Sequence, residues 1–145
     1  TPNSNFFASA QCLGYNLDKG IQLTIDVCYP SEDNILEQTE KIIKKVQPTV
    51  LFISADGNSM IEKFRNRFIN KYEIKIVKYE RPLDQSEGEA AHIDLYILSI
   101  AANAIVNCPS TFSAFAKRQR DTVNKPTEFW GIDSDKLTNE YNSDL

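Results

Sequence analysis

The sequence predicts an α/β fold in which an open, mainly parallel sheet is covered by helices. Segments of strand character alternate with segments of helical periodicity along the 145 residues, a pattern typical of parallel sheets with helical crossovers. The run 49–54, TVLFIS, is almost continuously apolar, as expected of a strand that is buried on both faces. The length suits one domain with a sizeable core, so we expect residues 1–145 to form a single domain.

Three strands are expected in the first part of the chain, after an irregular lead-in over residues 1–20. Each is rich in β-branched or aromatic residues and either alternates between apolar and polar positions or is continuously apolar. They are expected at 22–29, 49–54 and 72–79.

Two helices are expected between these strands. The first follows Ser31, a good N-cap residue, and begins with acidic residues that suit the positive end of the helix dipole. The dipeptide Gln47-Pro48 should end it. The second helix follows the turn 55–58 and carries four apolar residues at helical spacing, Met60, Ile61, Phe64 and Phe68.

The last part of the chain is expected to add a helix, two short strands and a polar tail. A polar loop over 80–89 precedes a helical pattern over 90–102. Short strands are expected at 104–107 and 127–131, and residues 133–145 form the tail.

The turn after the strand 104–107 is a candidate ligand site. Ser110 or Thr111 can cap a helix that runs to about residue 121. The first N–H groups of a helix have no internal partner and its dipole is positive at that end, so a diphosphate can bind there. The two hydroxyls would add donors and Phe112 an aromatic face. The same pattern also fits an ordinary capped helix that binds nothing.

Composition excludes several other functions. The net charge is −4 and no basic block is present, which argues against non-specific nucleic-acid binding as the main activity. Three cysteines and one histidine match no zinc-site spacing, so we expect no metal. The chain contains neither GxGxxG nor GxxxxGK, which disfavours dinucleotide and P-loop sites.

Four sequence motifs together carry a resemblance to a known family. They are FFASAQCLGY (6–15), LTIDVCYP (23–30), DLYIL (94–98) and NCPSTFSAFAKRQRD (107–121). In type, order and spacing these motifs resemble the GDP-fucose protein O-fucosyltransferases, in particular the type that acts on epidermal-growth-factor-like (EGF-like) repeats. The resemblance extends from residue 6 to about residue 131. A histidine-x-arginine motif in the family's other half has no counterpart here.

The resemblance implies a Rossmann-like fold similar to the C-terminal domain of a GT-B glycosyltransferase. The chain would be the donor-binding half of an inverting enzyme, which transfers fucose from GDP-fucose to Ser/Thr hydroxyls of EGF-like repeats in secreted or cell-surface proteins such as Notch. It implies a metal-independent reaction in the endoplasmic reticulum lumen. The N-terminal half of the same enzyme would be a partner, and no catalytic residue is assigned within this chain. The alternative is a non-catalytic α/β module that binds a nucleotide or a protein.

The resemblance also implies the site residues. Asp94 would bind guanine, because a carboxylate can accept from the N1–H and the exocyclic amine together, a pair of donors that adenine lacks. Ser110, Thr111 and Phe112 would bind the rest of GDP-fucose. Asp94 could instead be a charge in the first turn of a helix, with Glu89 as the fallback for the base.

Arginines and cysteines complete the expectations. Arg118 and Arg120 could pair with a diphosphate, but they lie well inside the helix and are interpreted first as structural ion pairs or interface residues. The resemblance implies a disulfide between Cys12 and Cys108, with Cys28 paired in the other half of the enzyme. Without the resemblance, the interpretation would be three buried free thiols in a cytosolic protein.

Overall fold

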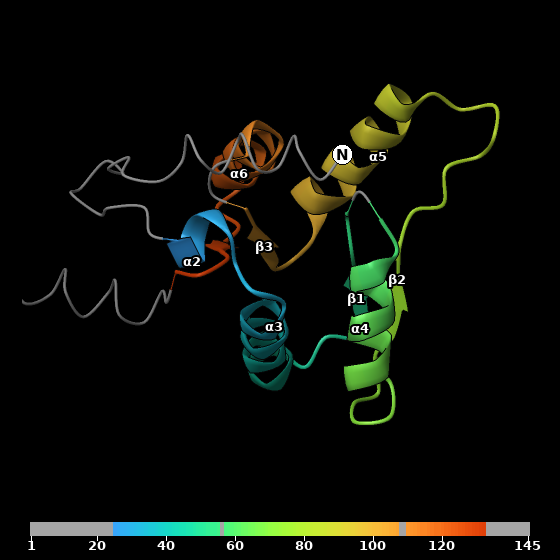
Figure 1. The fold of residues 1–145 in the computed structure, drawn as a ribbon. Coiled ribbons are helices and arrows are strands. Elements are labelled where there is room, and N and C mark those ends of the chain that lie inside the picture. Colours follow the sequence, from blue (N-terminus) through green and yellow to red (C-terminus); the bar gives the residue numbers. More distant parts are fainter. Residues whose placement is uncertain (1–24, 56, 108–109, 133–145) are drawn as a thin grey trace, which may run out of the picture. The chain divides into compact units, whose positions relative to one another are not determined.

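The computed structural model describes residues 25–55, 57–107 and 110–132 of the chain. They divide into two compact units (Figure 1). The central unit comprises Glu32–Ile100, and the flanking unit comprises the described residues before and after it, 25–31 and 101–132. Each unit contains one pair of parallel strands, and the two units are described separately below.

The central unit is built around a β-α-β crossover. Strands β1 (Val50–Phe52) and β2 (Lys75–Val77) pair in parallel, and helix α4 (Ser59–Phe68) connects them. Helix α3 (Glu32–Val46) precedes the crossover and α5 (Glu87–Ile100) follows it. A parallel pair requires such a long connection, which explains why the helical pattern stands between the two strand patterns in the sequence.

Apolar residues of α3, α4 and β2, together with residues next to the strand ends, form the core of the central unit. In α4 they recur at helical spacing, and Phe68 is completely buried with its ring centre 5.9 Å from that of Phe64. The buried cluster consists of Leu36, Ile43, Ile53, Ile61, Phe64, Phe68, Ile74 and Ile76.

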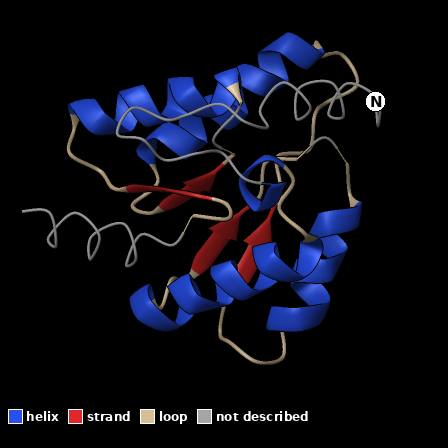
Figure 2. Cartoon of the chain, turned by 60° about the vertical axis from the view of Figure 1, so that its left-hand side comes forward, coloured by secondary structure: helices blue, strands red, loops and turns tan. Residues whose placement is uncertain are grey.

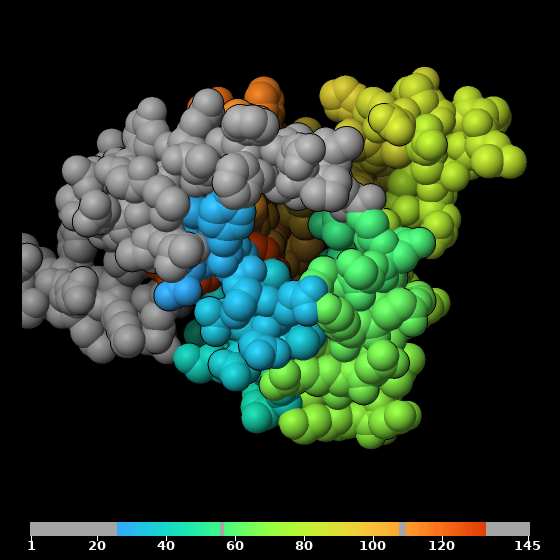
Figure 3. All heavy atoms as spheres, in the orientation of Figure 1, coloured from blue at the N-terminus to red at the C-terminus, as the bar shows by residue number. Residues whose placement is uncertain are grey.

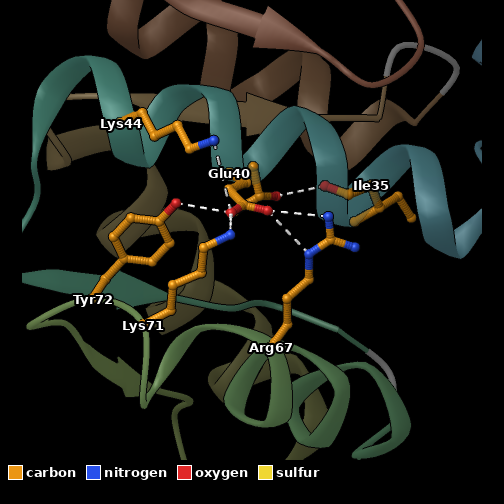
Figure 4. Close-up of polar contacts among 7 residues, drawn as sticks. Ile35, Glu40, Lys44, Arg67, Lys71 and Tyr72 are labelled. Atoms are coloured by element: carbon orange, nitrogen blue, oxygen red, sulfur yellow. Dashed lines mark hydrogen bonds and ion pairs between the residues drawn. The ribbon is translucent and has the colours of Figure 1, made fainter.

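A buried carboxylate joins α3 to the end of α4. Glu40 accepts hydrogen bonds from Arg67 Nε at 3.1 Å, Arg67 Nη2 at 3.0 Å, Tyr72 Oη at 2.8 Å, and Lys71 Nζ (Figure 4). The bonds from Lys71, Tyr72 and Arg67 outweigh the opposing effect of burial and lower the pKa of Glu40 from 4.5 to about 2. Because both carboxylate oxygens are already occupied by the protein, we interpret this cluster as structural.

A second, exposed ion pair lies at the other end of the same helix contact. Lys63 of α4 contacts Glu32 in the first turn of α3. Figure 3 shows atoms of α3 (cyan) and α4 (green) touching at the surface. Exposed pairs of this kind contribute little to stability, so the buried apolar cluster and Glu40 determine how α3 packs.

The flanking unit contains the second crossover. Strands β3 (Ala104–Val106) and β4 (Thr127–Phe129) pair in parallel, and α6 (Thr111–Thr122) connects them; the two strand pairs are drawn in red in Figure 2. A short helix, α2 (Ile25–Cys28), belongs to the same unit. The parallel order of each pair agrees with the predicted α/β class, although the predicted single sheet is seen as two pairs.

Arg120 of α6 is completely buried in the flanking unit. Its guanidinium donates to Thr127 Oγ1 at 2.9 Å, to the carbonyl oxygens of Pro126 at 2.7 Å and Ala102 at 3.2 Å, and to that of Ala101. Burial lowers the pKa of Arg120 from its usual value. These bonds tie the start of β4 to the segment before β3. Arg120 is thus structural, as expected, but these partners are carbonyl and hydroxyl oxygens rather than the carboxylate of the expected ion pair.

The strand predicted at 22–29 is wrong in its described part. Residues Ile25–Cys28 form α2, with Val27 and Cys28 buried. Gly131, after β4, lies against the backbone of Asp26, which places α2 close to the end of β4. Such packing can override the strand preference of a segment that is rich in β-branched residues.

The other predicted elements are confirmed with shifted ends. The described strands lie inside the predicted ranges, and α5 starts at Glu87 rather than at residue 90, which shortens the predicted loop over 80–89. Ser86 caps α5, since its Oγ accepts from Glu89 N at 3.2 Å. The predicted lead-in and tail fall outside the described residues. None of the described helices has the length and apolar character needed to cross a membrane.

Candidate functional site

The N-terminus of α6 has the geometry that its sequence predicts. Ser110 is the N-cap, with φ −84° and ψ 128°, and its Oγ accepts from Ser113 N at 3.3 Å. Ser113 is buried, and its own Oγ accepts from Asn107 N at 3.3 Å. The end of β3 and the first turn of α6 are therefore joined by side-chain bonds in a fixed local conformation.

This cap leaves hydrogen-bond donors available at the helix end. The cap uses the N–H of Ser113, whereas the N–H groups of Thr111 and Phe112 have no partner within the described part of the chain. The Ser110 hydroxyl acts as an acceptor in the cap, so its proton can still be donated. Two amides, a hydroxyl and the positive end of a dipole together suit a phosphate group.

Exposure differs among the three predicted residues of this turn. Thr111 is exposed, while Ser110 and Phe112 are partly buried. A ligand can thus contact the Thr111 hydroxyl without displacing the helix. Phe112 keeps part of its ring accessible, as the predicted aromatic contact requires.

Asn107 is a residue of this turn to which the sequence assigned no role. Its Oδ1 is buried without a hydrogen-bond partner, the one such side-chain atom in the ranges that the structure describes. Buried polar groups are usually satisfied. A water molecule or a ligand group at the turn would satisfy this amide. Only its place in the motif could have pointed to it.

Asp94 lies at the carboxyl end of β1 in the central unit. It is the eighth residue of α5, and its Oδ2 accepts a hydrogen bond from Ser54 Oγ at 2.8 Å. Ser54 follows β1 by two residues. Its hydroxyl is the part of this arrangement that the sequence did not reveal.

The position of Asp94 rules out one interpretation made from the sequence. A first-turn charge would lie within the first few residues of α5, and those acidic positions are Glu87 and Glu89. Asp94 lies about one turn further along the helix, where the dipole gives a carboxylate little stabilisation. Glu89, the fallback for base binding, is exposed in that first turn.

The predicted site residues therefore fall into two groups. Asp94 belongs to the central unit, and Ser110, Thr111 and Phe112 belong to the flanking unit. Ser110, Thr111 and Phe112 follow β3 in the sequence, and Asp94 is hydrogen-bonded to Ser54 just after β1. Both groups are thus associated with the carboxyl end of a strand in a parallel pair, which is where ligands bind in open α/β sheets.

Two other polar residues of α5 and α6 lie at the surface. His92 is exposed on α5, and Arg118 is exposed with its guanidinium carbon 5.9 Å from the Phe115 ring centre. No group of three or more potential metal ligands exists among the described residues.

Cys28 is joined in a disulfide, and its side chain is buried. The other two cysteines, Cys12 and Cys108, lie outside the described residues. A bond from Cys28 to either of them would exclude the expected Cys12–Cys108 pairing, and it would also remove the need for a Cys28 partner elsewhere.

Comparisons with known proteins agree with the sequence motifs. A family model described as GDP-fucose protein O-fucosyltransferase matches residues 1–123. The GDP-fucose protein O-fucosyltransferase 1 of Caenorhabditis elegans is 33% identical over 135 residues, which cover 91% of this chain and 32% of the relative. The chain thus spans about a third of the length of this curated relative.

Solved structures agree with both the fold and the family. A crystal structure of POFUT1 in complex with GDP-fucose is 31% identical with a TM-score of 0.67, over 87% of this chain and 34% of that one. The apo form of POFUT1 is 32% identical with a TM-score of 0.65, over 86% and 33% of the two chains. The family model and the structural likeness together show that this chain belongs to the GDP-fucose protein O-fucosyltransferase family.

Proposed function

We propose that this chain is the donor-binding, C-terminal part of a longer, inverting fucosyltransferase. The enzyme transfers fucose from GDP-fucose to serine or threonine hydroxyls of EGF-like repeats, including those of proteins such as Notch. The observation that carries the proposal is the N-terminus of α6, where a Ser110 cap leaves the Thr111 and Phe112 amides as available donors. This turn lies inside the motif 107–121, one of the four on which the family resemblance rests.

The proposed roles follow from the chemistry of each group. Asp94 accepts from the N1–H and the exocyclic amine of guanine. The Ser110 hydroxyl and the amides of Thr111 and Phe112 bind the diphosphate. Negative charge grows on that diphosphate as it leaves, so donors fixed in place stabilise the transition state.

The remaining chemistry lies outside these 145 residues. No side chain of this chain is assigned to attack or protonate the substrate, so the chain by itself is expected to transfer no fucose. The N-terminal part of the enzyme, with the arginine of its histidine-x-arginine motif, would supply the missing stabilisation. Side-chain and amide donors then replace a metal, and the enzyme works in the lumen of the endoplasmic reticulum.

Calorimetric titration of the full-length enzyme with GDP, GDP-fucose and ADP tests this proposal. We expect GDP and GDP-fucose to bind at least about tenfold more tightly than ADP, since ADP lacks the paired donors. Equal binding of GDP and ADP would contradict it. Tight GDP binding without fucose transfer to a folded EGF-like repeat would indicate the alternative, a non-catalytic nucleotide-binding module.

A further inference from the structure

We propose that Ser54 is a positioning residue that orients the carboxylate of Asp94 for guanine and thereby sets the preference for guanine over adenine. This inference rests on the proposed function, because it assumes that Asp94 binds the base. The observation behind it is the 2.8 Å hydrogen bond from Ser54 Oγ to Asp94 Oδ2, between residues 40 positions apart in the sequence.

The backbone near Ser54 is held firmly. The preceding residue, Ile53, is buried in the core of the central unit. The Ile53 N–H also donates to Val77 O at 2.9 Å, which extends the β1–β2 pairing by one residue. The Ser54 hydroxyl is therefore presented from the end of a packed strand rather than from a loose loop.

Asp94 needs such a support more than most side chains of its helix. The Asp94 side chain is only partly buried, so close packing by neighbouring side chains does not by itself fix its orientation. An aspartate in the middle of a helix gains nothing from capping, and its side chain can adopt several rotamers. A hydrogen bond from the strand end selects one of them before the ligand arrives, which reduces the entropy lost on binding.

The bond also leaves room for the base. An ionised carboxylate offers about four acceptor positions on two oxygens. Ser54 takes one position on Oδ2, and Oδ1 accepts no hydrogen bond from the described residues. Two donors in one plane, such as the N1–H and the exocyclic amine of guanine, can then reach both oxygens. Ser54 acts through Asp94 and does not need to touch the nucleotide.

The test compares GDP and ADP binding by calorimetry for variants of the full-length enzyme. For Ser54→Ala we expect about a fivefold to tenfold loss of GDP affinity with less than about a twofold change for ADP. Ser54→Thr keeps the hydroxyl and should remain within about twofold of the wild type for both. Should Ser54→Ala not fold, Ser54→Cys gives the same comparison, because a thiol has similar size but donates weakly.

Ser99→Ala provides a matched control. Ser99 is a partly buried serine of α5, the helix that carries Asp94. Its Oγ donates to Leu95 O at 2.7 Å rather than to Asp94. Its removal should leave both affinities unchanged.

A double-mutant cycle separates positioning from a general structural effect. In an Asp94→Ala background, Ser54→Ala should cause no further loss of GDP affinity, since the group it orients is gone. An undiminished loss in that background, or equal losses for GDP and ADP, would overturn the inference. So would a Ser54→Ala variant with wild-type preference while Asp94→Ala loses it, and that result would leave the proposed function intact. If Asp94→Ala itself keeps the guanine preference, the base assignment fails and this inference fails with it.

Discussion

Glu40 and Arg120 each place a full charge in a buried position, and they are held in different ways. Glu40 accepts hydrogen bonds from two cationic side chains and a phenol, which lower its pKa to about 2. Arg120 donates to carbonyl oxygens and a hydroxyl, which satisfy its N–H groups. The first arrangement depends on pH in an accessible range, whereas arginine stays charged at any ordinary pH.

The stability of the fold should fall in acid through Glu40. Its pKa is lower in the folded chain than its ordinary value of 4.5, so its contribution is complete above about pH 5 and is lost as the pH falls towards 2. Glu40→Gln should lower the free energy of unfolding at pH 7 by about 2–3 kcal/mol. Urea denaturation at several pH values should show a shallower acid dependence for this variant than for the wild type.

Glu62→Gln is the control for that measurement. Glu62 forms an exposed pair with Arg65 at 3.6 Å, and such pairs contribute less than about 1 kcal/mol. Its removal should leave both the stability and the acid dependence close to wild type. An acid dependence that is the same in Glu40→Gln and wild type would contradict the assignment.

Two substitutions in the proposed site should affect nucleotide binding in different ways. Asp94→Ala would remove the two charge-assisted bonds that we propose to guanine, each worth about 1.5–3 kcal/mol in favourable cases. The binding of GDP and of GDP-fucose should then weaken together, and the preference over ADP should be lost. Thr111→Ala removes one exposed hydroxyl and keeps the amide, so GDP binding weakens by about 1 kcal/mol with the preference retained. For Thr111→Ala, the turnover rate should fall by a larger factor than the GDP affinity if the contact of the Thr111 hydroxyl strengthens in the transition state. Calorimetry and initial rates distinguish these outcomes.

Sequence reasoning located some of these residues and missed others for a physical reason. Ser110 and Ser113, which the capping bond joins, are three residues apart, so a local sequence pattern is enough to predict this bond. Ser54 and Asp94 are 40 residues apart, and Arg67 and Glu40 are 27 apart. No periodicity encodes such pairs, because they form only when the crossover folds.

The ends of helices and strands are fixed by a few backbone positions. Gln47 and Asn124 have positive φ angles of 47° and 56°. Gln47 N donates to Ile43 O at 2.9 Å, which completes the last turn of α3. Gly131 has φ +76° and meets the backbone of Asp26. The sequence predicts the end of α3 from Gln47-Pro48, whereas it does not predict the close approach of Gly131 to the backbone of Asp26.

Gly131→Ala should destabilise the flanking unit. A Cβ at this position would lie 2.3 Å from the carbonyl oxygen of Asp26, and the φ of +76° disfavours any L side chain. Both effects act on backbone atoms, so the cost should be about 2 kcal/mol or more. Thermal unfolding followed by circular dichroism measures it.

Gly88→Ala should have the opposite sign. Gly88 lies in the first turns of α5, and the nearest atom to its added Cβ is Ser86 Oγ at 4.0 Å. Alanine favours the helix over glycine by up to about 1 kcal/mol. If both alanine variants unfolded at the same temperature, the close approach at Gly131 would carry no energetic weight.

Element type was more predictable than element position in space. Helices α3 and α4 follow from apolar periodicity, and α6 follows from its Ser110 cap. Residues 25–28 alternate like a strand but form α2, because packing against Gly131 outweighs their β propensity. Such a contact joins residues about a hundred positions apart, and the local sequence contains no signal for it.

At the scale of the whole chain, the parallel strand pairs agree with the predicted α/β class, and the comparisons confirm the predicted family. The predicted single domain stays a prediction. Each unit has its own crossover and its own buried residues. The alternating pattern in the sequence predicts each crossover, since a parallel pair needs a connecting helix.

The disulfide at Cys28 should lie within this chain. Cys28 is 2% exposed and bonded, and the sequence offers Cys12 and Cys108 as partners. Trypsin separates the three cysteines into peptides 1–19, 20–41 and 79–117, because Arg81 precedes proline. Mass spectrometry of an unreduced digest should therefore find peptide 20–41 linked to one of the other two, and reduction should release both. A 1–19 peptide linked to 79–117, with peptide 20–41 linked to neither, would instead support the Cys12–Cys108 pairing that the family resemblance implies. The two patterns exclude one another in a chain with three cysteines, so this digest decides between them.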